Sequence, residues 1–388
     1  MIKVASRLGE TKEYYFSRKL REVAQINESS DTKIINLGIG SPDLPPHPAV
    51  IEALQEAATS PSNHGYQSYQ GAAVLRKAFA DWYQKYYNVK LNWETEILPL
   101  IGSKEGIMHI AMTFLEEGDA VLVPNPGYPA YQAVSKLTGA TTILYDLKEE
   151  DNWLPSLDKI EANDLTKVKI MWVNYPNMPT GADACTDFYN RLIAFAKKHE
   201  ILIVNDNPYS FILNESPKSI FAINGAKDVA LELNSLSKSH NMAGWRIGAV
   251  FGRSDLLKEV LRFKSNMDSG MFLPAQIAAT KALLLDESWY SQQNEIYTQR
   301  RKLAWDIMDL LKVRYNQNAV GLFVWGKVPE DIQDVEAWLD YYLYKAKVFI
   351  TPGFIFGTNG ERYIRISLCG SIGNFEEAIN RIKQAKGN

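Results

Sequence analysis

The feature that most constrains the fold of this chain is a regular alternation of short apolar runs with segments of helix length. Five runs have the length and composition of buried strands, and they cover residues 120–123, 141–145, 169–173, 201–205 and 229–233. Segments 128–137 and 186–198, which lie between such runs, show helical spacing. Parallel strands need long crossover connections, so this alternation predicts an α/β fold with a mostly parallel sheet.

The length of 388 residues predicts two domains rather than one. A proline-rich stretch at residues 41–46 can be neither helix nor central strand and reads as a linker. We therefore expect residues 1–45 to be an N-terminal segment of a small domain and residues 46–275 to form a large domain. Residues 276–388 would complete the small domain at the C-terminal end.

Composition excludes several classes of function. A net charge of −3 with 22% charged residues gives no reason to expect nucleic acid or a membrane surface as a partner. No apolar run approaches the length of a membrane span, and the first residues have no apolar signal core. Two cysteines, Cys185 and Cys369, imply no disulfide framework and fit a reducing compartment. Cytoplasm is therefore the expected location.

Polar residues gather immediately after the strand-like runs. Tyr128 follows the first run, Asn174 and Asn177 follow the run at 169–173, and Asp206 and Tyr209 follow the run at 201–205. In open parallel sheets, ligands bind beyond the carboxyl ends of the strands. Each residue alone has an ordinary structural explanation, such as a turn or aromatic packing. Their common position predicts a site at this edge of the sheet.

Lys238 is the strongest single candidate for chemistry. It follows the run at 229–233 and is expected in a loop with Ser235, Ser237 and the cation Arg246. A partly desolvated lysine near another cation loses its proton more easily, and a neutral amine can form a Schiff base with an aldehyde. Serine hydroxyls can donate to a phosphate. For a Ser-x-x-Lys motif alone, a solvated surface lysine is the alternative interpretation.

The whole string from Ser235 to Gly248 resembles the lysine signature of the class I/II aminotransferases, which are fold-type I enzymes that use pyridoxal 5'-phosphate. The resemblance extends over most of the chain. It implies that Lys238 carries the cofactor aldehyde, that Arg246 holds its phosphate, and that Ser235 and Ser237 assist. It also implies the fold-type I architecture, in which a large cofactor-binding domain is joined to a smaller α/β domain.

Further roles follow from the resemblance. The helix start at Gly102, Ser103 and Lys104 would bind the cofactor phosphate, although any capped helix start looks similar. Tyr128 would stack on the cofactor ring, and Tyr209 would bond its phenolic oxygen. Asp206 would pair with the ring nitrogen.

Three more assignments concern the substrate and a second subunit. Arg365 would clamp the substrate α-carboxylate bidentately, with Gly40 nearby, although a lone arginine in a strand is usually solvated. Tyr66 would reach across a homodimer to the partner's cofactor phosphate, although spacing alone favours a packed loop tyrosine. No residue is assigned to a metal.

One position departs from the family pattern. The loop Asn174-Tyr175-Pro176-Asn177-Met178-Pro179-Thr180-Gly181 has methionine where the family usually has an asparagine that bonds the phenolic oxygen. A thioether is only a weak acceptor. Either Asn174 or Asn177 takes over part of this contact, or the contact is missing.

The resemblance implies a transaminase that moves an amino group from an L-amino acid to a 2-oxo acid in a ping-pong cycle through the Lys238 Schiff base. Two alternatives stay open: a carbon–sulfur β-lyase with the same cofactor, and a binding module that has lost its chemistry. The sequence does not identify the donor and acceptor. Candidates for reading the substrate side chain are Tyr14, Tyr15, Ile39 and the segment 264–272.

Overall fold

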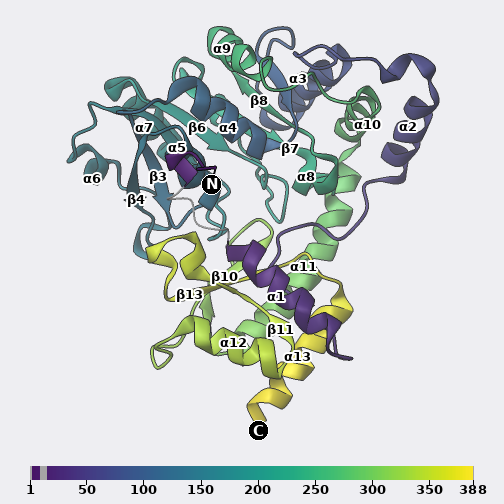
Figure 1. The fold of residues 1–388 in the computed structure, drawn as a ribbon, viewed down its shortest axis with the longest axis vertical. Helices are drawn as coiled ribbons and strands as arrows, with labels where there is room; N and C mark the ends of the chain where they lie inside the picture. The colour runs from purple at the N-terminus through teal and green to yellow at the C-terminus, as the bar shows by residue number, and fades with distance from the viewer. Residues whose placement is uncertain (1, 9–14, 388) are drawn as a thin grey trace.

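The computed structural model describes residues 2–8 and 15–387. Its centre is a seven-stranded sheet in the order β2-β8-β7-β6-β5-β3-β4 (Figure 1). The strands are β2 (Ile97–Leu100), β3 (Ala120–Asn125), β4 (Thr141–Asp146), β5 (Val168–Val173), β6 (Leu202–Asp206), β7 (Ala230–Ser235) and β8 (Gly248–Gly252). Only β8 is antiparallel to its two neighbours, so the prediction of an α/β fold with a mostly parallel sheet is confirmed.

Helices cover both faces of this sheet, which explains why its inner strands are continuous apolar runs. Along β5, Ile170 and Trp172 point into one buried cluster while Met171 and Val173 point into the other. The first face is covered by α4 (Ser103–Phe114), α5 (Pro129–Leu137) and α9 (Ser254–Lys264). The second is covered by α3 (Ala73–Tyr87), α6 (Leu157–Glu161), α7 (Thr186–His199) and α10 (Leu273–Leu283), and α10 also packs against α2 (Pro48–Thr59).

A smaller α/β part lies below the large sheet in Figure 1. Its antiparallel sheet has the order β12-β13-β10-β9, and β1 pairs with β11 in a separate two-stranded sheet. These strands are β1 (Ile35–Asn36), β9 (Arg314–Tyr315), β10 (Phe323–Lys327), β11 (Val348–Phe349), β12 (Thr351–Pro352) and β13 (Tyr363–Ser367). The long α11 (Glu287–Leu310) connects the two parts, and α12 (Val335–Lys345) and α13 (Ile372–Gly387) flank the smaller sheets.

Helix α1 (Tyr15–Glu28) comes from the start of the chain but packs on this C-terminal part (Figure 1). The buried ammonium of Lys19 lies 2.8 Å from the carboxylate of Asp340 on α12, and Tyr15 packs edge-on against Phe354. The N-terminal segment thus packs on the C-terminal part, and the division into domains with boundaries at residues 45 and 275 stays a prediction.

The structure corrects several local expectations. Lys238 does not lie in a loop, because residues Leu236–Ser239 form the short helix α8 directly after β7. Strand β2 and helix α9 were not predicted at all. Helix α1 is described only from Tyr15, so Tyr14, a candidate for reading the substrate side chain, lies outside the described residues. Within the described part of the chain, no helix is long and apolar enough to cross a bilayer.

Candidate active site

A cavity of about 410 Å³ lies between the two parts of the molecule. Its upper wall comes from the start of α4 and from the chain that follows β5, β6 and β7. Its lower wall comes from α1, β10, β13 and the 3-10 helix η7 (Gly353–Phe356). The predicted site residues that line it are Gly40, Ser103, Lys104, Tyr128, Asn174, Asp206, Tyr209, Ser235, Ser237, Lys238, Arg246 and Arg365.

Lys238 points from α8 into this cavity. Its Nζ atom donates a hydrogen bond of 2.5 Å to the carbonyl oxygen of Gly40. Burial lowers the pKa of the Lys238 ammonium, and the nearby cations Arg365 and Arg246 lower it further. A larger fraction of the amine is therefore neutral and nucleophilic than for an ordinary lysine.

Asp206 lies at the carboxyl end of β6. One of its carboxylate oxygens accepts a hydrogen bond, and the other has no partner. Its Oδ2 accepts a 2.8 Å hydrogen bond from the hydroxyl of Tyr131, while its buried Oδ1 has no partner. Burial raises the pKa of Asp206 to about 6, and the bond from Tyr131 and the charge of Lys238 act in the opposite direction. A buried open carboxylate oxygen suits a cationic N–H donor such as a protonated pyridine ring.

Tyr131 is a site residue that sequence reasoning missed. Its ring stacks on Trp172 with the planes 5° apart, and it meets Tyr128 edge-on. The only signal in the sequence is its spacing of three residues from Tyr128 on the expected helix, which places both rings on one helix face.

The start of α4 forms a cradle for an anion. Gly102 has a φ of +82°, and a Cβ atom at this position would lie only 2.2 Å from a guanidinium nitrogen of Arg246. The buried hydroxyl of Ser103 has no hydrogen-bond partner, and the hydroxyl of Ser235 donates to that of Ser237 at 2.8 Å. A helix N-terminus, a cation and hydroxyl groups together fit a phosphate.

Arg365 enters the cavity from β13 in the lower wall. Its Nη2 donates to the carbonyl oxygen of Gly38 at 2.7 Å, and its Nη1 lies 3.1 Å from the sulfur of Met178. Its guanidinium also packs over the ring of Phe323, at 4.0 Å from the centroid. These contacts hold the guanidinium plane in place beside the cavity.

Only one of the two candidate asparagines reaches the cavity. Asn174 lines it, and its side chain donates to the carbonyl of Asp206 at 2.6 Å and accepts from the Met178 amide at 2.7 Å. Asn177 does not line it. Its side chain instead closes the loop by bonding Asn174 and Thr180.

Tyr66 lies away from the cavity and is 94% exposed. Tyr128 and Tyr209 both line the cavity, and Tyr209 meets the ring of Phe323 edge-on. The burial of Tyr209 raises the pKa of its hydroxyl, so this group stays a hydrogen-bond donor at neutral pH.

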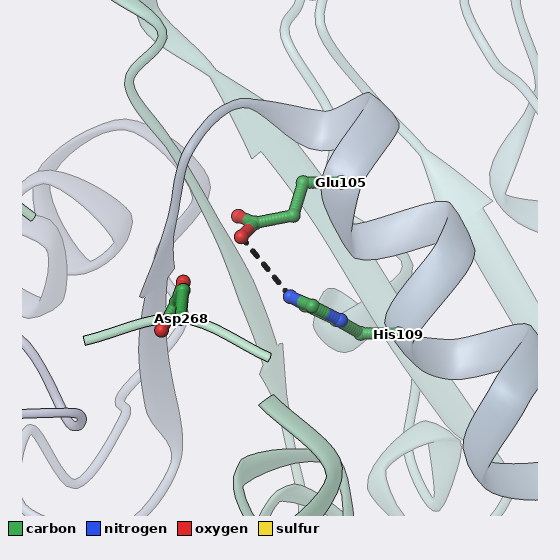
Figure 2. Close-up of side chains that lie close together, drawn as sticks. All are labelled: Glu105, His109 and Asp268. Carbon is green, nitrogen blue, oxygen red and sulfur yellow. Dashed lines mark ion pairs between the residues drawn. The ribbon is translucent and has the colours of Figure 1, made fainter. Parts of the chain in front are cut away.

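A second polar cluster joins two residues of α4 to one from the segment after α9 (Figure 2), and none of the three lines the cavity. Glu105 and His109 are one helical turn apart, 3.1 Å between Oε1 and Nε2, and the carboxylate of Asp268 lies beside them. The buried ammonium of Lys264 lies 2.6 Å from both oxygens of Asp268. Lys264 thus supplies positive charge to the carboxylate of Asp268, beside the pair of Glu105 and His109. The expectation that no metal is bound stays a prediction.

The profile of the family described as aminotransferase class I and II matches residues 32–382. The chain belongs to the class I and II aminotransferases. A relative from Dehalococcoides mccartyi (strain CBDB1), named LL-diaminopimelate aminotransferase, is 40% identical to this chain. The match covers 98% of this chain and 98% of the relative. The relative of the same name in Aquifex aeolicus is also 40% identical and is matched over 100% of both chains.

Solved structures of this aminotransferase family superpose closely. The substrate-bound BacF structure from Bacillus subtilis has a TM-score of 0.94 at 36% identity, covering 99% of this chain and 98% of that one. A probable N-succinyldiaminopimelate aminotransferase from Thermus thermophilus has a TM-score of 0.85 at 30% identity, covering 95% and 99%. The fold-type I architecture and the transaminase class are thereby confirmed, and the β-lyase alternative is not favoured.

Proposed function

We propose that this aminotransferase binds pyridoxal 5'-phosphate covalently at Lys238 and moves an amino group from an L-amino acid to a 2-oxo acid. The observation that carries the proposal is the convergence of three features on one cavity. These are the buried amine of Lys238, the open oxygen of Asp206, and the anion cradle at the start of α4. An aldehyde, a pyridinium nitrogen and a phosphate are the three groups that such a set fits.

The cofactor end of the cavity is assigned as follows. Gly102, Ser103 and Lys104, with Ser235, Ser237 and Arg246, would hold the phosphate. Tyr128 would stack on the ring and Tyr209 would donate to its phenolic oxygen. When bound, the cofactor withdraws electrons from the substrate α-carbon, and the carboxylate of Asp206 would keep its ring nitrogen protonated for this purpose.

The chain's own groups would then move the proton and hold the substrate. Arg365, steadied by Gly38 and Met178, would bind the α-carboxylate through two parallel hydrogen bonds. Lys238 Nζ, beside the carbonyl of Gly40, would remove the proton from the α-carbon as a general base. The depressed pKa of its ammonium favours this role near neutral pH.

Met178 changes the expected contact with the phenolic oxygen. Its thioether faces Arg365, and Asn177 is engaged within its own loop. We therefore assign this contact to Tyr209, with Asn174 as the only amide side chain of that loop at the cavity wall.

We also propose a homodimer with shared active sites, in the cytoplasm. Four exposed apolar side chains belong to two segments of the chain, and they are Tyr66, Tyr69, Met267 and Phe272. Their two segments are adjacent, since a Cβ on Gly270 would lie 2.7 Å from the carbonyl oxygen of Gln67. A second copy would cover this patch and receive Tyr66 at its phosphate cradle.

The two free cysteines agree with a reducing compartment, as proposed for the cytoplasm.

The dimer proposal predicts the effect of one hydroxyl. Tyr66→Phe should weaken cofactor affinity by about tenfold while light scattering still gives a dimer, because the change removes one hydrogen bond to a phosphate and little packing. Tyr69→Phe, in the same loop, is the matched control and should keep full affinity. A monomeric enzyme with full turnover would contradict the shared site.

The covalent attachment can be tested directly. Borohydride reduction of the holoenzyme, followed by digestion and mass spectrometry, should place the reduced cofactor on the peptide that contains Lys238. The same preparation should transfer amino groups to 2-oxoglutarate or pyruvate. It should not release pyruvate and ammonia from a cysteine conjugate without a 2-oxo acid. A label on another lysine would refute the assignment.

A further inference from the structure

The two ends of the cavity differ sharply in chemistry. The end formed by the large sheet carries the hydroxyls and charges described above. The opposite end is apolar apart from the guanidinium of Arg365 on β13, and the apolar part of its described lining comes from Phe16 and Leu20 on α1, Ile39 before the proline-rich linker, Phe323 on β10 and Phe356 in η7. Three aromatic rings and two branched aliphatic side chains therefore line this end, and we call them the apolar wall.

This apolar wall adjoins the proposed carboxylate clamp. The guanidinium carbon of Arg365 lies 4.0 Å from the ring centroid of Phe323, 4.6 Å from that of Phe356 and 5.7 Å from that of Phe16. An amino acid whose carboxylate is bound by Arg365 and whose amine is at Lys238 has one remaining substituent on the α-carbon. That side chain must leave the charged end and lie against these rings.

The charged groups of the described lining already have roles. They are Lys104, Asp206, Lys238, Arg246 and Arg365. Lys104 and Arg246 stand at the anion cradle, Asp206 and Lys238 face the cofactor ring, and Arg365 binds the α-carboxylate. LL-diaminopimelate, the substrate in the names of the relatives, carries a second ammonium and a second carboxylate. Burying these charges against Phe, Leu and Ile side chains without partners is strongly unfavourable.

We propose that this enzyme selects amino acids with large apolar or aromatic side chains and disfavours LL-diaminopimelate. The inference rests on the proposed function, because it uses the same clamp and the same lysine. Phenylalanine would bury its ring among Phe16, Phe323 and Phe356, where offset and edge-on ring contacts add to the gain from burial. Leu20 and Ile39 would complete the enclosure for aliphatic side chains such as leucine.

A donor comparison on the holoenzyme tests this directly. Phenylalanine, leucine, alanine and LL-diaminopimelate would each be mixed with the enzyme in single turnovers, following the change in the visible band of the bound cofactor. We expect kcat/KM for phenylalanine to exceed that for LL-diaminopimelate by at least about tenfold. An equal or higher value for LL-diaminopimelate would overturn the inference. If no donor reacts, alanine included, the proposed function itself fails.

Ligand binding gives a second readout that does not depend on turnover. Calorimetry with 3-phenylpropionate and with pimelate should show tighter binding of the aromatic acid by at least about tenfold. Leu20→Arg places a cation in the apolar wall and should reverse or abolish this preference. Ala24→Arg adds the same charge at an exposed position of α1, one turn after Leu20, and should keep the preference. An unchanged preference in Leu20→Arg, or equal affinities in the parent enzyme, would contradict the proposal.

Discussion

Replacing Lys238 with alanine is expected to lower turnover by about 1,000-fold or more, the scale typical of losing a positioned general base and nucleophile. The reason lies in the position of its amine, which is buried at the cavity and bonded to Gly40 rather than to a carboxylate. No other lysine has been assigned to the ring end of the cavity. Steady-state rates with 2-oxoglutarate, together with loss of the borohydride label, would measure the effect.

Two controls separate the chemical role of Lys238 from a structural one. Lys258→Ala removes an exposed lysine on α9 and should leave turnover and label intact. Added ethylamine should restore part of the activity of Lys238→Ala, because a small free amine can occupy the space of the missing side chain. Normal turnover by Lys238→Ala would refute the assignment outright.

Asp206→Asn is the second change with a large expected effect. It keeps the shape and the bond from Tyr131 but removes the negative charge proposed to hold the ring nitrogen protonated. We expect turnover to fall by about 100-fold or more, as for the loss of one preorganised electrostatic contact. Asp255→Asn, which changes a carboxylate on the exposed start of α9, is the matched control and should keep full turnover. Retained turnover in Asp206→Asn would contradict the pairing.

The same carboxyl predicts a pH effect on the stability of the protein without cofactor. Its pKa rises from 3.8 to about 6 on folding, which corresponds to about 3 kcal/mol. The native state binds this proton more tightly than the unfolded state does. The protonated carboxyl therefore stabilises the native state below pH 4, and this stabilisation is lost as pH rises through 6. Between pH 4 and 7, the unfolding free energy of Asp206→Asn should therefore rise relative to the parent. Urea titrations measure this difference, and a difference independent of pH would contradict it.

The sequence predicts the large sheet and one half of the cavity well, because both depend on local patterns. Residues that follow β5, β6 and β7 meet at one edge because parallel strands place their carboxyl ends together. Asn174, Asp206 and Lys238 can thus be grouped from the order of the strands alone. The helix around Lys238 was missed because a four-residue helix has no periodicity to detect.

The other half of the cavity depends on contacts between distant segments, which periodicity cannot reveal. Phe16 lies 307 residues before Phe323 in the chain, yet both rings pack around the guanidinium of Arg365. The bond from Tyr131 to Asp206 likewise joins residues 75 positions apart. Local patterns also leave some questions open. The match to the family loop does not tell whether Asn174 or Asn177 faces the cavity, and only Asn174 does.

The construction of the cavity from two separate sheets has an evolutionary consequence. The residues proposed to surround the cofactor ring lie on or just after strands of the seven-stranded sheet, whereas Phe16, Phe323 and Phe356 belong to α1 and the smaller part. Amino-acid preference can therefore drift through substitutions in one half without disturbing the other. Two aminotransferases that are 40% identical, such as this chain and its relative, can therefore share the same reaction and still differ in the amino acids they accept.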